Sequence, residues 1–121
     1  MSAVMITVND VRRAVMSALA ARFPDTRVYG EKSAQGFVAP AFFVFMFPVY
    51  HTQELGRRYL RRHSFDVHYF PTGDYENDEM HDVAEQLYDV LEIIDANGKP
   101  IRGTAMRHEI VDGVLHFFVD Y

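Results

Sequence analysis

Residues 41–50, AFFVFMFPVY, are apolar on both sides of the alternation, and this pattern limits the folds that the chain can adopt. Successive side chains of a β-strand point to opposite faces, so Phe43, Phe45 and Phe47 share one face and Phe42, Val44 and Met46 the other. An apolar run of this length predicts a strand buried on both sides, with Pro48 at its end or at a bulge. The ten Phe and seven Tyr of the chain must be buried inside the domain or against a partner.

Length and composition bound the class of protein. The 121 residues match the size of one domain, and with no internal repeat or linker we expect a single domain over residues 1–121. The absence of cysteine excludes disulfides, thiolate zinc sites and a cysteine nucleophile. The start lacks the pattern of a secretory signal, and no apolar run approaches the roughly 18 residues of a membrane span. We expect a soluble cytoplasmic protein with no membrane partner.

The first helix has clear signals at both ends. Thr7 can cap it with Asp10 three residues on, and apolar residues then recur at helical spacing until Phe23 and Pro24 end it. The sequence predicts a helix over residues 8–22.

Strand patterns follow. Val28 and Tyr29 begin a short strand, and residues 51–56 form a loop or the tip of a long hairpin. Residues 57–70 alternate apolar and polar side chains, which predicts one strand with a solvated face.

The second helix follows the turn PTGDY, with Asn77 or Asp78 as its cap. An apolar stripe opposite an acidic one makes it amphipathic. Two hairpin signals come next, Asn-Gly at 97–98 and Asp-Gly at 112–113. A two-residue loop at the second predicts three cross-strand pairs: Val111 with Val114, Ile110 with Leu115, and Glu109 with His116.

These elements predict an α+β fold. We expect a mixed or antiparallel β-sheet with the two main helices packed on one face, in the order α-β-β-β-α-β-β. Since two helices cover one face only, some aromatic rings of the other face are expected to contact a neighbouring subunit.

The sequence contains no catalytic motif, and we expect no enzyme and no cofactor. Among the six histidines, His63 with His68, or His108 with His116, could approach across strands. However, His63 and His68 fall on opposite faces of their strand, and no HExxH motif is present. We therefore expect no metal site, and interpret the histidines as half-buried partners of carboxylates such as Glu109.

Charge is segregated along the chain. Residues 71–95 contain nine acids and no Lys or Arg, whereas the segment GRRYLRRH at 56–63 contains four arginines. The arginines allow three interpretations: pairing with the acidic helix of a neighbouring copy, a solvated or intramolecular role, or nucleic-acid binding. The net charge of −5 argues against the last. Arg is enriched at interfaces and binds carboxylates through two parallel hydrogen bonds, so we favour the first. The predicted subunit interface comprises Arg57, Arg58, Arg61, Arg62, Asp78, Asp82, Glu85 and Asp89.

Three long blocks carry a family resemblance. RRYLRRHSFDVHYFPTGD, MHDVAEQLYDVLEII and RGTAMRHEIVDGVLHFFVDY resemble the signature blocks of the phage tail terminator family of tailed phages and Gram-positive prophages. The resemblance implies an α/β sandwich with a mixed sheet flanked by helices, and it transfers no catalytic residue.

The resemblance also implies a role in virion assembly. Such a subunit forms a homo-oligomeric ring, expected to be hexameric, at the head-proximal end of the tail. There it stops polymerisation of the tail tube protein and offers a docking surface for the head–tail connector or head-closure protein. The protein would then be found in the virion, and in the host cytoplasm during assembly. Two alternatives stay open: another head–tail adaptor or tail-completion protein, and a small metal-dependent enzyme that uses histidine and a carboxylate.

Overall fold

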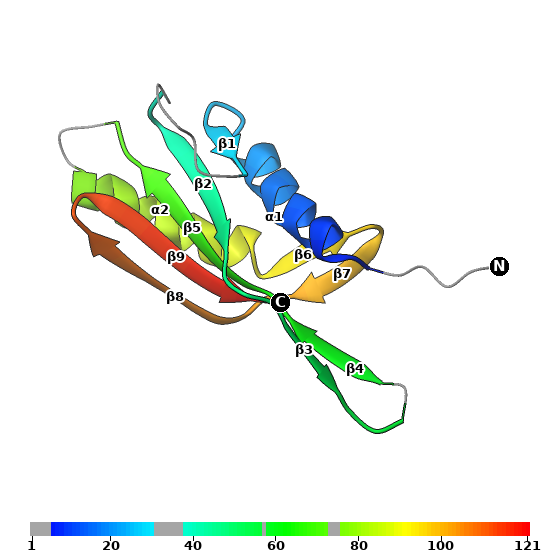
Figure 1. The fold of residues 1–121 in the computed structure, drawn as a ribbon. Coiled ribbons are helices and arrows are strands. Elements are labelled where there is room, and N and C mark those ends of the chain that lie inside the picture. Colours follow the sequence, from blue (N-terminus) through cyan, green and yellow to red (C-terminus); the bar gives the residue numbers. More distant parts are fainter. Residues whose placement is uncertain (1–5, 31–37, 57, 73–75) are drawn as a thin grey trace.

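The computed structural model describes residues 6–30, 38–56, 58–72 and 76–121 (Figure 1). Helix α1 (Val8–Arg22) has the predicted bounds. The backbone N–H of Thr7 donates to Asp10 Oδ2 (2.9 Å), and the N–H of Asp10 donates to Thr7 Oγ1 (3.1 Å). These two bonds satisfy backbone donors that no helical carbonyl can reach, which explains why the helix begins there. They also lower the pKa of Asp10.

The main sheet has five strands in the order β1-β2-β5-β9-β8. β1 (Arg27–Tyr29) runs parallel to β2 (Ala41–Met46), and β5 (Ser64–Phe70), β9 (Val114–Asp120) and β8 (Thr104–Val111) pair antiparallel. The predicted mixed α+β fold is confirmed. β5 and β9 lie at the centre, with every second side chain buried.

Both helices cover the same face of the sheet (Figure 1). α1 and α2 (Glu76–Val90) contribute Leu19 and Leu87 to one core, together with Phe42, Phe65 and Phe117 from the sheet. The predicted placement of the two helices on one face is therefore confirmed. Neither helix in the described part of the chain is long and apolar enough to cross a membrane.

The strand predicted to be buried on both sides is so only in its first half. Residues 41–44 are buried on both faces, but Phe45 is partly exposed and Phe47 is 46% exposed. Pro48 lies past the end of β2, as predicted. Its ring carries no N–H to donate, so the regular ladder cannot continue through it.

The single strand predicted over 57–70 is wrong. It is divided at His63 into β4 (Tyr59–Arg62) and β5, and β4 pairs with β3 (Tyr50–Gln53) in a separate two-stranded sheet. Alternation alone cannot show that a strand leaves one sheet for another. The predicted order is short of four strands: two arise because each long strand before the second helix is broken, and two belong to the Asn97-Gly98 hairpin, which the order leaves out.

The second helix begins earlier than predicted. Asn77 and Asp78 lie inside its first turn, so neither is the cap, and the residues just before Glu76 lie outside the described ranges. Beyond α2, β6 (Ile93–Ala96) and β7 (Lys99–Arg102) form the hairpin predicted at Asn97-Gly98. Both turn residues have positive φ, 52° and 84°, as a type I′ turn requires.

The predicted register of the last hairpin is confirmed at all three pairs, with Glu109 opposite His116. One irregularity was not predicted. The β8–β9 register shifts between Thr104 and Arg107, where Ala105 has a φ of 54°. A bulge of this kind twists and interrupts a sheet edge, which hinders pairing with a foreign strand.

Candidate functional site

The most exposed apolar surface lies on the hairpin formed by β3, β4 and their connection, called here the arm (residues 50–62). The arm extends away from the sheet and helices (Figure 1), and every residue of both its strands is exposed. Its large side chains include Tyr50 (67% exposed), Leu55 (89%), Tyr59 (55%) and Leu60 (50%). Exposed apolar groups gathered in this way are typical of interaction surfaces.

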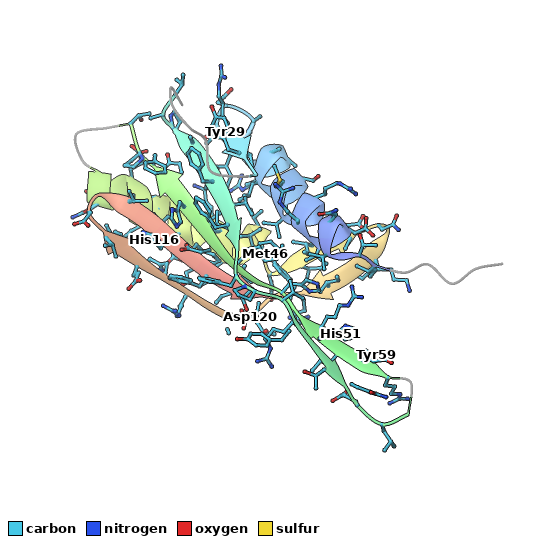
Figure 2. All side chains as sticks on the ribbon, in the orientation of Figure 1. Tyr29, Met46, His51, Tyr59, His116 and Asp120 are labelled. Carbon is cyan, nitrogen blue, oxygen red and sulfur yellow. The ribbon has the colours of Figure 1, made fainter. Side chains whose placement is uncertain are left out.

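The two faces of the arm differ in character, and Arg61 and Arg62 lie on opposite ones. On one face Arg61 Nε donates to His51 Nδ1 (3.0 Å), and His51 stacks on Tyr59 with ring centroids 4.7 Å apart (Figure 2). The other face carries Tyr50, Leu60 and Arg62.

At its base the arm joins the face of the sheet that the helices leave open. A groove of about 380 Å³ there is lined in part by Tyr50, Phe47, Arg107 and Phe118. Phe47 lies parallel to Phe118 (centroids 6.4 Å apart), and the guanidinium of Arg107 lies 4.0 Å above the Phe118 ring. Apolar and cationic surface therefore runs continuously from the arm onto the sheet.

The predicted interface residues occupy two separate surfaces. Arg58, Arg61 and Arg62 lie exposed on the arm, whereas Arg57 lies outside the described residues. The acids are all exposed on α2, on the other side of the body (Figure 1): Asp78, Asp82, Glu85 and Asp89. Across the described residues, no member of either set forms an ion pair, so neither surface is neutralised by the other within one chain.

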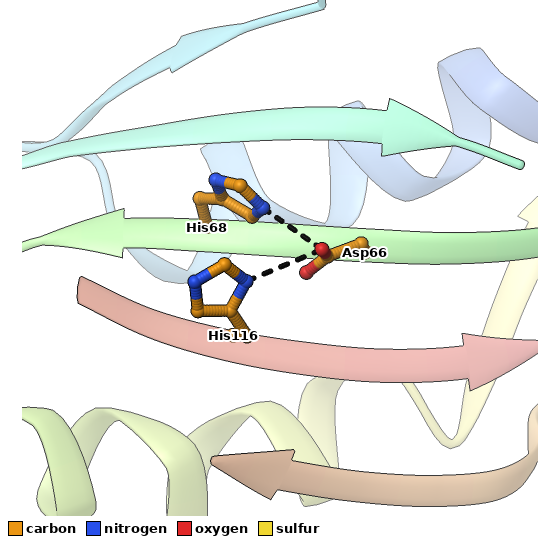
Figure 3. A group of neighbouring side chains, drawn as sticks. All are labelled: Asp66, His68 and His116. Atoms are coloured by element: carbon orange, nitrogen blue, oxygen red, sulfur yellow. Dashed lines mark hydrogen bonds and ion pairs between the residues drawn. The ribbon is translucent and has the colours of Figure 1, made fainter. Parts of the chain in front are cut away.

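The open face of the sheet holds a cluster that the sequence did not predict: Asp66, His68 and His116. Asp66 Oδ2 accepts hydrogen bonds from His68 Nε2 (2.9 Å) and His116 Nδ1 (3.2 Å) (Figure 3). The predicted association of half-buried histidines with carboxylates is thus present, but the acid is Asp66 and not Glu109. Alternation placed Asp66 and His68 on one face of a strand, and only the pairing of β5 with β9 could add His116.

The histidine approaches considered from the sequence do not occur. His63 is buried and His68 lies on the open face, as the alternation predicted. His108 is opposite Phe117 and faces α2, where Tyr88 Oη contacts its Nδ1 at 2.8 Å and His81 Nδ1 lies 3.2 Å from its Nε2. It therefore cannot meet His116, which faces the other way.

Buried polar groups tie the arm and α2 to the sheet. His63, at the base of the arm, exchanges two backbone hydrogen bonds with Tyr121, both 2.8 Å. Burial, and secondarily the charge of Arg61, lower the pKa of His63. Tyr69 Oη donates to Glu79 Oε2 (2.6 Å), and burial together with that carboxylate raises the pKa of Tyr69. Similarly, burial raises the pKa of Tyr121, whose hydroxyl donates to Leu91 O (2.6 Å).

Comparison with known proteins identifies the family. A solved structure known only by a sequence identifier has the same fold, with a TM-score of 0.51 and 16% identity over 96% of this chain and 93% of that one. A search of curated protein sequences found no match. The model of a family described as phage tail terminator protein matches residues 10–121, which is nearly the whole chain. This chain therefore belongs to the phage tail terminator family, and it is a structural protein of phage tail assembly.

Proposed function

We propose that copies of this chain form a ring, with six as the expected number, that caps the head-proximal end of a tail tube. The ring stops polymerisation of the tube and presents a docking surface to the head–tail connector. The arm carries this proposal, since it exposes Tyr50, Leu55, Tyr59 and Leu60 beyond the core of the chain. An isolated two-stranded hairpin is only marginally stable in water, so a neighbouring copy that covers the arm would also stabilise it.

Charge complementarity supports a second copy as that neighbour. The arm presents Arg58, Arg61 and Arg62, and α2 presents carboxylates that include Asp82 and Glu85. The two surfaces are different parts of the molecule, so pairing the arm of one copy with α2 of the next is head-to-tail. A head-to-tail contact generates a closed ring when its rotation closes. Arg57 belongs to the same proposed interface.

The open sheet face adds apolar area to this interface. Phe47 remains 46% exposed in the single chain, whereas Phe43 is only 5% exposed because Tyr29 stacks on it (4.9 Å) and Phe70 packs edge-on (5.3 Å). The rings available to a neighbour are therefore those at the base of the arm. The role is structural, and we assign no catalytic step to the chain.

Charge reversal tests the ring contact. Arg61→Glu is expected to leave the monomer folded, as judged by circular dichroism, and to reduce the assembled fraction measured by light scattering and negative-stain imaging. Lys99→Glu is the matched control, because Lys99 is also exposed but lies on the β6–β7 hairpin. An Asp82→Lys copy mixed with the Arg61→Glu copy is expected to regain some assembly. Rings unaffected by both reversals would show that this contact is not the one that forms them.

Removal of the arm tests the wider proposal. A chain in which Asn-Gly replaces residues 49–62 keeps His63 and its backbone hydrogen bonds with Tyr121, and it should fold and stay monomeric, because the β2–β5 ladder can close as a hairpin. Unmodified protein mixed with tail-tube protein is expected to sit at tube ends in electron micrographs. Monomers only, at high concentration and low salt, with no binding to tube ends or connector, would contradict the proposal. Binding to the connector alone would favour the alternative of another head–tail adaptor.

A further inference from the structure

We propose that Asp66, His68 and His116 form a binding site for a divalent transition-metal ion such as Zn²⁺ on the open face of the sheet. One ligand atom from each residue lies within 4.8 Å of the others, and Asp66 Oδ2 is 2.9 Å from His68 Nε2 and 3.2 Å from His116 Nδ1 (Figure 3). Two imidazoles and a carboxylate are a common zinc donor set. Bonds of about 2.1 Å at tetrahedral angles separate neighbouring ligand atoms by about 3.4 Å, close to the two distances from Asp66 Oδ2 to the histidine nitrogens.

The three side chains are held in place by the sheet. Asp66 and His68 are two residues apart on β5 and so share a face, and His116 is directly opposite His68 on β9. Both strands have a paired neighbour on each side. Aromatic rings flank the imidazoles, with Phe45 4.5 Å from His68 and Phe118 stacked 6.3 Å from His116. An ion would therefore bind with little rearrangement of its ligands.

The hydrogen bonding of Asp66 provides an independent indication of a cation. Both imidazole N–H groups donate to the same oxygen, Oδ2, whereas Oδ1 is buried and has no hydrogen-bond partner among the described residues. An unpartnered buried carboxylate oxygen is costly, and a bound ion would compensate it. The ion would replace the two protons between the rings and the carboxylate. Since the histidine side chains are each 21% exposed and that of Asp66 14%, solvent can deliver the ion and supply a water ligand.

Zinc titration of tag-free, metal-free protein tests the site, by competition with a chromophoric chelator. We expect one equivalent of Zn²⁺ to bind. His68→Gln or His116→Gln should weaken Zn²⁺ binding at least about ten-fold. Removal of a residue that only hydrogen-bonds to a metal ligand already has an effect of that size, and these variants remove a ligand itself. His81→Gln is the matched control. It removes a histidine from the other histidine pair, formed with His108 on the helix-covered side, and should leave the affinity unchanged.

Two further measurements make the result decisive. Zn²⁺ is expected to raise the melting temperature of the unmodified protein and of the His81→Gln variant, but not that of His116→Gln, because binding stabilises only a fold that contains the site. Co²⁺ should give visible absorption typical of four-coordinate nitrogen and oxygen ligation. Absence of stoichiometric binding, or equal binding by the His116→Gln variant, would overturn the proposal and leave a hydrogen-bonded triad without a metal role. The ring proposal does not depend on either outcome.

Discussion

Replacing Tyr121 by phenylalanine removes one hydroxyl at the junction of the arm, the sheet and the end of α2. That hydroxyl donates to Leu91 O at 2.6 Å, and the ring packs edge-on against Phe65 with centroids 5.9 Å apart. Leu91 directly follows the last residue of α2, where carbonyl groups have no helical N–H partner. The variant therefore leaves a helix-end carbonyl without its partner while preserving the packing of the ring.

The expected cost of Tyr121→Phe at pH 7 is about 1–3 kcal/mol in the free energy of unfolding, the range for leaving a buried polar group unsatisfied. For a domain of this size, about 1 kcal/mol corresponds to roughly 4 °C in melting temperature. Urea denaturation and thermal melts measure both values. Tyr59→Phe is the control, because Tyr59 is 55% exposed and its hydroxyl forms no hydrogen bond among the described residues.

Alkaline pH should reduce the difference in free energy of unfolding between the unmodified protein and the Tyr121→Phe variant. Burial raises the pKa of Tyr121 in the folded state above the value of about 10 in the unfolded chain. The contribution of the protonated Tyr121 hydroxyl to the free energy of unfolding is therefore fully present below pH 10. It decreases as the pH rises, and at pH 11 the unmodified protein has lost about 1.4 kcal/mol. The Tyr121→Phe variant has no hydroxyl to ionise at this position. The difference in free energy of unfolding between it and the unmodified protein should therefore shrink by that amount between pH 9 and 11. Equal stabilities at pH 7, or a deficit independent of pH, would refute the account of Tyr121.

Four other changes can be measured by urea denaturation. Thr7→Ala should cost about 1 kcal/mol by removing the helix cap. Gly103→Ala should cost about 2 kcal/mol or more, because a Cβ there would lie 2.7 Å from the backbone oxygen of Leu91. Ala105→Gly should stabilise the fold by about 0.5–1 kcal/mol, since φ is 54° there. Below about pH 6.5 the free energy of unfolding should decrease. The pKa of buried His63 is lowered in the folded state, so protonation favours the unfolded chain. In the His63→Gln variant, the free energy of unfolding should decrease less over the same pH range.

Local signals in the sequence proved reliable where the structure depends on neighbouring residues. The bounds of α1 follow from Thr7, Asp10 and Pro24, and the β8–β9 register follows from the two-residue turn at Asp112-Gly113. In each case the interacting groups are close in sequence, so the pattern contains the information needed.

The sequence patterns could not predict which strands distant in the chain pair with each other. His116 joins Asp66 and His68 only because β9 pairs with β5 across some 50 residues, and no alternation specifies that partner. The sequence predicted the tip of a long hairpin at 51–56, but not that the hairpin leaves the main sheet, for a related reason. Tyr59 and Leu60 continue the pattern that leads into β5, although their strand has left the main sheet. The composition of the arm was nevertheless recognised, since its arginines were singled out as an interface.

The position of the arm in the chain bears on how proteins of this kind can diversify. The β2–β5 register places Met46 opposite Phe65, and the N–H of Phe47 donates to Ser64 O at 2.8 Å. Residues 48–63 are thus an insertion at the end of an otherwise regular hairpin. Because the core residues lie outside the insertion, apart from His63 at its edge, the arm can change in length and sequence without repacking the core. Under the proposed role of the arm, selection could therefore alter what the protein recognises with little effect on its folding stability.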